Sequence, residues 1–253
     1  MPTTTDPLAP LLRLPGVTEA MAAARAALVT VHNHPANRRG WLAGAAEASL
    51  RAARASAALD GAPLADRIGD GSADATVGPV LAGSVRAAEE SGRLLAAWRT
   101  APLQALARLH VVAAGDLLPP DRHDAELGRP RPDQGLASRL GLLADLVTGA
   151  TSAPAPVLVA IVHGELLGLA PFTGANGVVA RAAARLTAVS SGLDPRGLAV
   201  PEVGHLRHAA EYRRLATGFA GGSSAAVAAW IVHCCAQWEV GAREGIAIGD
   251  ARS

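Results

Sequence analysis

The chain has 253 residues, of which 50% are hydrophobic and 3% aromatic, and its formal net charge is +1. This length supplies enough apolar material for one large core. The near-neutral charge, with no basic tail or stripe, argues against a nucleic-acid partner. All 23 basic residues are Arg, so neither a Schiff-base Lys nor a P-loop Lys is available.

No apolar run reaches the roughly 18 residues that a membrane span needs, and the N-terminus lacks a secretory pattern. We therefore expect a cytoplasmic protein without a membrane partner. The only cysteines, Cys234 and Cys235, are neighbours that would point in different directions on a helix. This disfavours a disulfide or a zinc site and predicts buried thiols in a core helix.

The abundance of Ala and Leu predicts an all-α fold, because strands prefer β-branched and aromatic residues. Apolar periodicity, prolines and glycines predict helices over 18–31, 41–59, 79–98, 101–114, 136–149, 156–169 and 222–243, and a further helix that carries Arg181 near its first turn and continues to Ser191. Residues 63–78 are expected to form a surface loop. Four prolines within residues 115–135 exclude a continuous helix there.

The strongest functional signal lies between His163 and Arg181. Pro171 predicts the end of one helix, because the residue before a proline avoids helical geometry. A loop of small residues then leads into a second helix that carries Arg181. Unpaired backbone N–H groups at a helix N-terminus, together with a nearby Arg, form an anion site. The stretch therefore predicts a helix–loop–helix phosphate cradle.

This stretch also resembles the signature of Fic (filamentation-induced-by-cAMP) domain proteins, H-P-F-x-[D/E]-G-N-G-R-x-x-R. The residues that match are Pro171, Phe172, Asn176, Gly177 and Arg181. The residues that depart are Ala170 for the motif His, Gly174 for the acidic residue, Ala175 for the first Gly and Val178 for the first Arg.

The resemblance implies a Fic-like helical bundle with a flap, often a short β-hairpin in that family, that holds an extended segment of a target protein. On this reading residues 1–39 are a helical extension, residues 40–243 are the Fic-like domain and residues 244–253 are a tail. The flap residues would be Gly128, Arg129, Pro130 and Arg131. A solvated linker is the alternative for that segment.

Residues 41–61 would then be an inhibitory-type helix, since Ser56 to Gly61 resembles the Fic inhibitory motif [S/T]-x-x-x-E-[G/N] with Asp60 in place of Glu. In that family the carboxylate pairs with the second signature Arg and obstructs productive ATP binding. The resemblance therefore implies regulatory roles for Ser56, Asp60 and Gly61 and a pair between Asp60 and Arg181. A carboxylate at a helix C-terminus is otherwise unfavourable against the helix dipole.

In Fic enzymes the motif His is the general base that activates a target hydroxyl, and loss of such a base typically costs about 10²- to 10⁴-fold in rate. Ala170 has no titratable group, Gly174 has no side-chain ligand for Mg²⁺, and Val178 removes a phosphate-binding Arg. We therefore assign no catalytic residue and expect no conventional protein AMPylation. His163, two helical turns before Ala170, is expected to form a core hydrogen bond.

The loop itself still predicts a site for ATP, another nucleotide or phosphate. Its residues are Phe172, Thr173, Gly174, Ala175, Asn176, Gly177, Val178 and Arg181. Three hypotheses follow: a degenerate Fic-fold protein that acts through protein partners, an adenylyltransferase or related transferase with a non-standard site, and a helical scaffold or toxin-neutralising protein without a ligand. A homo-oligomer is compatible with each of them.

No metal site is assigned. His32 and His34 form an H-x-H pattern without an acidic or Cys companion nearby, so capping or packing is the expected role. Glu202, His205 and His208 share helical spacing, but the second E-x-x-H copy of a di-iron protein is missing. We interpret those three residues as one helix face.

Overall fold

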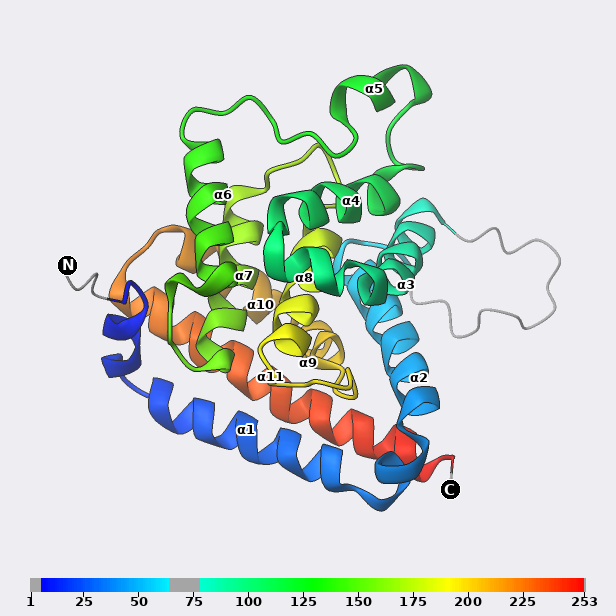
Figure 1. The fold of residues 1–253 in the computed structure, drawn as a ribbon, viewed down its shortest axis with the longest axis vertical. Coiled ribbons are helices and arrows are strands. Elements are labelled where there is room, and N and C mark those ends of the chain that lie inside the picture. The colour runs from blue at the N-terminus through cyan, green and yellow to red at the C-terminus, as the bar shows by residue number, and fades with distance from the viewer. Residues whose placement is uncertain (1–5, 64–77, 253) are drawn as a thin grey trace, which may run out of the picture.

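The computed structural model describes residues 6–63 and 78–252. Within these ranges the chain is helical and contains no strand, which confirms the all-α prediction (Figure 1). The helices are α1 (Val17–Asn33), α2 (Pro35–Leu59), α3 (Pro79–Thr100), α4 (Pro102–Ala114), α5 (His123–Glu126), α6 (Leu136–Asp145), α7 (Ala155–Leu169), α8 (Asn176–Ser190), α9 (Pro201–Arg207), α10 (Ala209–Ala220) and α11 (Ser224–Asp250). Shorter turns are η1 (Ala9–Arg13), η2 (Pro120–Arg122) and the π-helical turn η3 (Leu146–Ala150).

Helix boundaries differ from the sequence prediction at both ends of the chain. Helix α2 begins at Pro35, six residues before the expected start, and non-helical backbone at Gly40 bends it. A proline is well placed at the start of a helix because its missing N–H would have no partner there. Helix α11 continues to Asp250, so the boundary proposed after residue 243 falls inside a helix.

The flap region is not a β-hairpin. Its residues form η2 and α5, and the chain around Pro130 has neither helical nor strand geometry. Because proline has no N–H to donate, four prolines remove many of the ladder bonds that a hairpin would need. The predicted loop over 63–78 lies almost entirely outside the described residues.

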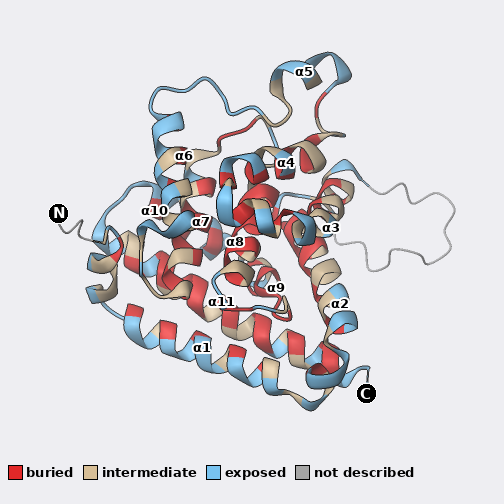
Figure 2. Cartoon of the chain, in the orientation of Figure 1, coloured by how far each residue is buried: buried red, intermediate tan, exposed pale blue. Residues whose placement is uncertain are grey.

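Helices α7 and α8 lie at the centre of the molecule, and α1 and α11 lie side by side along one edge (Figure 1). Apolar residues of α1, α7, α10 and α11 form one core cluster. Those of α3, α4, α6, α7 and α8 form a second cluster. Helix α7 is mostly apolar, and nine of its 15 residues are buried, as expected for a central helix. Figure 2 shows the buried residues concentrated on these central helices.

The loop 170–175 therefore connects two helices, α7 and α8, that are largely buried in the core. Ten residues of α8, including Arg181, are buried, and seven of them are Ala or Val. Such small side chains allow neighbouring helices to approach closely. Cys234 and Cys235 are free and buried in α11, as predicted.

No helix of the described residues combines the length and the apolar character that crossing a membrane requires.

Candidate functional site

The loop between α7 and α8 contains two left-handed residues that are not glycine. Ala170 ends α7 with φ 41°, and Ala175 precedes α8 with φ 53°. They are the non-glycine residues with positive φ in the described part of the chain. Left-handed geometry costs an ordinary residue about 1–2 kcal/mol, because its Cβ crowds the following carbonyl oxygen. Ala175 thus adopts a left-handed conformation at a position where the Fic signature has glycine.

Asn176 closes this loop with two hydrogen bonds. The Phe172 N–H donates to Asn176 Oδ1 over 2.9 Å, and Asn176 Nδ2 donates to the Phe172 carbonyl over 2.7 Å. A side-chain amide can satisfy a donor and an acceptor on one backbone residue in this way. The signature residues Phe172 and Asn176 therefore fix the loop conformation.

The carboxylate of Asp60 lies at the N-terminus of α8. Its Oδ2 accepts a hydrogen bond from the Val178 N–H over 3.1 Å, and its Oδ1 accepts one from Arg181 Nη2 over 2.8 Å. The unfavourable position of Asp60 at the C-terminus of α2 is thus offset by the favourable end of a second helix. An anion belonging to the chain itself lies in the predicted cradle.

Gly177 permits this approach. A Cβ at residue 177 would lie 2.3 Å from Asp60 Oδ1, much closer than real Cβ contacts. Replacement of Gly177 by a larger residue would therefore push the carboxylate out of the cradle. Gly177 has an ordinary helical φ, so its backbone conformation does not require glycine. The nearby Asp60 side chain does, because it leaves no room for a Cβ.

Arg181 is buried, with 3% of its side chain exposed, and all three of its nitrogens are engaged. Besides Asp60, Nε donates to Ser56 Oγ over 2.8 Å, Nη2 to the Ser56 carbonyl over 2.9 Å, and Nη1 to Tyr212 Oη over 3.3 Å. Burial lowers the pKa of Arg181, while Tyr212 and Asp60 raise it, and the net pKa lies above the ordinary value. The guanidinium is therefore a fixed positive charge beneath the loop.

His163 forms the core hydrogen bond predicted from the sequence. Its Nε2 lies 2.9 Å from Tyr212 Oη. Burial raises the pKa of Tyr212 to about 12, so the phenol remains protonated and donates to His163. Burial, together with the charges of Arg181 and His233, lowers the pKa of His163 to about 3. His163 is thus neutral at pH 7 and bound to a partner away from the loop.

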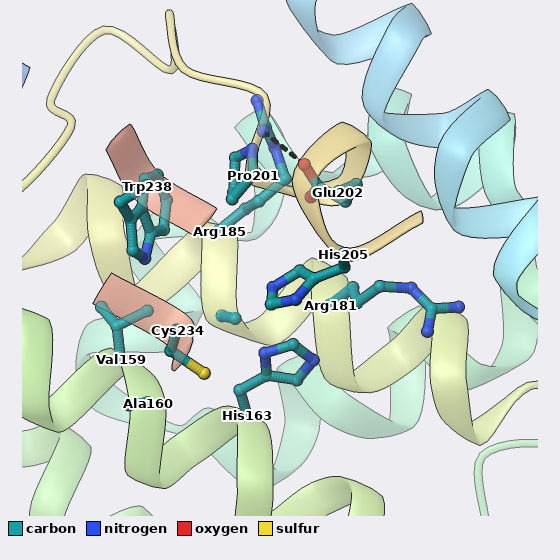
Figure 3. A pocket seen from close by; sticks show the side chains of 11 residues that line it. Val159, Ala160, His163, Arg181, Arg185, Pro201, Glu202, His205, Cys234 and Trp238 are labelled. Atoms are coloured by element: carbon teal, nitrogen blue, oxygen red, sulfur yellow. Dashed lines mark hydrogen bonds and ion pairs between the residues drawn. The ribbon is translucent and has the colours of Figure 1, made fainter. Parts of the chain in front are cut away.

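A small internal cavity borders this cluster, as Figure 3 shows. Its volume is about 10 Å³, which holds one water molecule at most. His163 and His205 line it, and the guanidinium of Arg181 extends away from it. Glu202 pairs with Arg185 over 3.3 Å on the same cavity. These groups form a packed polar core, since the cavity is too small for a substrate.

His110 connects the loop to the flap segment. Its Nδ1 accepts a hydrogen bond from the Gly128 N–H over 2.9 Å, so its proton lies on Nε2 and is donated to the Thr173 carbonyl over 3.2 Å. The imidazole also stacks on Phe172, with ring centroids 4.4 Å apart. Burial lowers the pKa of His110, which favours this neutral form.

Arg131 forms a second link between flap and loop. Its N–H donates to the Pro171 carbonyl over 2.8 Å, and its Nε donates to the Ala170 carbonyl over 3.0 Å. Arg129 and Pro130 remain exposed beside it. The structure thus brings the predicted flap segment to the signature loop, although its secondary structure differs from the one expected.

The positions that depart from the signature offer no substitute chemistry. Ala170 lies in the loop without a polar side chain, and Gly174 is exposed at φ 79°. The Val178 side chain is 3% exposed and packs in the core cluster of α3, α4 and α8. No group of three or more His, Cys, Asp or Glu residues that could hold a metal occurs in the described ranges. The residues of the loop do not fit the Mg²⁺ site of the Fic signature.

The sequence analysis found the loop, Asp60 and Arg181 but missed Tyr212 and His110. Tyr212 is the only Tyr of the chain, and its buried hydroxyl needs a partner. His110 is a single His in an apolar stretch of α4. Either feature marks a buried polar contact, but neither indicates which distant residue it meets.

Comparison with solved structures identifies the architecture. A Fic family protein from Desulfovibrio desulfuricans G20 matches with a TM-score of 0.74 and 17% identity, over 92% of this chain and 74% of that chain. Fic-1 (residues 134–508) from C. elegans matches with a TM-score of 0.68 and 16% identity, over 94% and 74% of the two chains. A variant of the same Fic-1 fragment matches with a TM-score of 0.66 and 17% identity, over 92% and 71%.

No family model matches the sequence, and no curated protein does so either. The chain nevertheless has the Fic fold, as the signature resemblance implied.

Proposed function

We propose that this Fic-fold protein binds a nucleotide or phosphate at the N-terminus of α8, lacks conventional protein AMPylation activity, and acts through a protein partner. The observation that carries the proposal is the position of Asp60. Its carboxylate accepts hydrogen bonds from the Val178 N–H and from Arg181, and thereby stands in for a phosphate oxygen. A site that holds one oxyanion in this way has the donors to hold another.

Asp60 gives the cradle a closed and an open state. An incoming phosphate must displace a carboxylate that lies in the same molecule and pairs with a buried Arg. The Asp60 side chain is 26% exposed and ends α2, so it can leave without unpacking a core residue. The affinity for nucleotide then depends on the difference between the free energies with which the phosphate and the Asp60 carboxylate bind the cradle. Any change at residue 60 should therefore alter this affinity.

The absence of AMPylation follows from the residues of the loop. A hydroxyl nucleophile needs a base within hydrogen-bond reach, and Ala170 provides none. His163 does not replace it, because its Nε2 is occupied by Tyr212 and its pKa is about 3. The transferase with a non-standard site is therefore disfavoured. Phosphate binding and positioning require only the donors that remain.

The proposed partner-binding segment is Gly128 to Arg131. Arg129, Pro130 and Arg131 are exposed, while Arg131 and His110 join the segment to Pro171 and Thr173. A partner bound to the segment would therefore contact the same unit that holds the phosphate. This arrangement favours a binding protein over a scaffold whose loop has no ligand.

Calorimetric titration with ATP, with and without Mg²⁺, tests the proposal. We expect Asp60→Ala to bind ATP about tenfold more tightly than the parent, because the competing carboxylate is removed. Tenfold corresponds to about 1.4 kcal/mol of binding free energy. Mg²⁺ should change this affinity little, because Gly174 supplies no ligand. The double variant Asp60→Ala/Arg181→Lys should lose most of the gain, since Lys lacks the guanidinium fork.

Asp116→Ala is the matched control. Asp116 is an exposed carboxylate that forms a 2.7 Å ion pair with Arg86, which is not a residue of the cradle. Its affinity for ATP should equal that of the parent. If neither Asp60→Ala nor the parent binds millimolar ATP or phosphate, the cradle has no ligand and the scaffold hypothesis replaces the proposal.

A further inference from the structure

A second and larger cavity lies beneath the N-terminal turn η1, away from the signature loop. Its volume is about 390 Å³, within the range of roughly 300–1,000 Å³ that is usual for small-molecule sites. Its walls are mainly apolar and include Leu8, Leu11, Leu143, Leu146, Ile161 and Phe219. Three charged residues also line it, and all three lie on α6 or α7.

Two irregular elements build this cavity. The π-helical turn η3 contributes Leu146 and Ala150, and such turns occur frequently at functional sites. The turn η1 contributes Leu11 and is fastened by Asp6, whose carboxylate accepts hydrogen bonds from the Thr151 hydroxyl (2.7 Å) and the Ser152 N–H (2.6 Å). Specific hydrogen bonds thus hold the elements that line the cavity together.

The charged residues that line the cavity favour a cation. Arg139 and Glu165 neutralise each other in an ion pair of 2.6 Å. The Asp145 side chain is exposed and has no ion pair or side-chain hydrogen bond within the described ranges. The free charge beside the apolar walls is therefore negative.

We propose that this cavity binds an amphipathic amine, whose apolar body lies against the leucines and whose ammonium group pairs with Asp145. A cavity of about 150 Å³ holds one benzene molecule, so this one accommodates a body of roughly 10–15 non-hydrogen atoms. A linear or ring-containing alkylamine of that size meets both requirements. The site is independent of the α8 cradle.

Calorimetry on the full chain with decylamine, decanol and decanoate, below their aggregation concentrations, tests both the cavity and the charge. Decylamine should bind most tightly and decanoate least tightly. Asp145→Asn should weaken decylamine binding by about two- to fivefold, the range for an exposed ion pair, and should leave decanol unchanged.

A blocking variant tests the location. Ala150 is exposed on η3 and lines the cavity, so the indole of Ala150→Trp should occupy cavity space without replacing a core residue. This variant should bind none of the three probes. Ala125→Trp, at an exposed position on α5, is the control for surface aromaticity and should bind decylamine like the parent.

Several results would overturn the proposal. Absence of saturable decylamine binding to the parent would exclude the site, and equal binding by Ala150→Trp would exclude this location. Decanoate binding as tight as decylamine binding, or an unchanged affinity in Asp145→Asn, would exclude amine recognition. If the parent self-associates, Ala150→Trp does not, and no probe binds, the cavity face would instead be a contact with a second copy of the chain.

Discussion

Asp60 and Arg181, which are 121 residues apart in the sequence, form a 2.8 Å ion pair at the N-terminus of α8. Arg181 is buried and Asp60 is partly exposed, so only the carboxylate can exchange with solvent or with a ligand. The pair therefore stabilises the helix packing and, under the proposed function, also closes the phosphate cradle. These two roles predict effects of opposite sign when Asp60 is removed.

Asp60→Ala should lower the free energy of unfolding in the absence of ligand by about 1–2 kcal/mol, because Arg181 loses a charged acceptor and the Val178 N–H loses its partner. The loss should be smaller than for a fully buried pair, because water can enter the space that the partly exposed Asp60 carboxylate leaves beside Arg181. Urea unfolding with and without ATP measures it. Saturating ATP should reduce the difference from the parent. A destabilisation that ATP leaves unchanged would contradict the exchange of one anion for another.

Gly177→Ala should displace Asp60 without removing its carboxylate. The new Cβ would lie 2.3 Å from Oδ1, so the Asp60 side chain must move. We expect a loss of about 1–2 kcal/mol in unfolding free energy, as for Asp60→Ala. ATP affinity should not rise, because the methyl group narrows the cradle itself. Gly141→Ala in α6, where a Cβ meets nothing within 4 Å, is the control and should be neutral or stabilising. Equal stability of Gly177→Ala and the parent would show that the carboxylate does not lie against Gly177.

Most of the architecture could be predicted from local pattern. Proline and glycine mark the helix ends, and apolar periodicity marks the helices, so α3, α4, α7 and α8 differ from expectation by two residues at most. The extension of α2 to Pro35 was not predicted, because its first turns contain Arg38, Arg39 and Gly40 in place of an apolar stripe. The continuation of α11 past residue 243 was not predicted either; there Ile248 packs against Ala48 and Ala52 of α2, a contact between distant segments.

The site could be predicted in part for a different reason. The signature resemblance joined Asp60 to Arg181, a contact that no periodicity indicates. Tyr212 and His110 are absent from that signature, and both act through contacts between distant segments. The prediction of a β-hairpin was wrong. It came from the flap that Fic proteins often have, whereas the prolines of this chain remove hydrogen bonds that a strand ladder needs.

Ala175→Gly should stabilise the protein by up to about 1 kcal/mol. Ala175 is held at φ 53°, a conformation that glycine adopts without strain, although glycine also loses more backbone entropy on folding. Thermal unfolding measures the change. Ala144→Gly, a substitution inside α6, is the control and should destabilise by about 0.5–1 kcal/mol. A destabilisation of the same size in both variants would show that residue 175 is not strained.

His110→Phe should release the flap segment from the loop. The Phe ring preserves the stack on Phe172 but accepts no hydrogen bond from the Gly128 N–H and donates none to the Thr173 carbonyl. Hydrogen exchange of the Gly128 amide should therefore accelerate, while amides inside α8 stay protected. Arg129→Ala, which changes an exposed side chain on the same segment, should not affect the exchange. Unchanged protection of Gly128 in His110→Phe would mean that other contacts hold the flap.

His163 should make the protein sensitive to acid. Its pKa is about 3 in the folded state against an ordinary value of 6.5, so between these values the unfolded chain binds a proton that the folded chain does not. The stabilisation is therefore complete above pH 6.5 and is lost as the pH falls toward 3, at up to about 1.4 kcal/mol per pH unit for this residue.

Urea unfolding of the parent and of His163→Gln at several pH values between 7 and 4 measures this slope. The Gln side chain can still accept the Tyr212 hydroxyl hydrogen bond but does not titrate. Its slope should be shallower by about one proton, whereas Thr217→Ala on the exposed face of α10 should keep the parent slope. Parallel curves for His163→Gln and the parent would show that His163 takes up a proton in the folded state, in conflict with its burial beside Arg181.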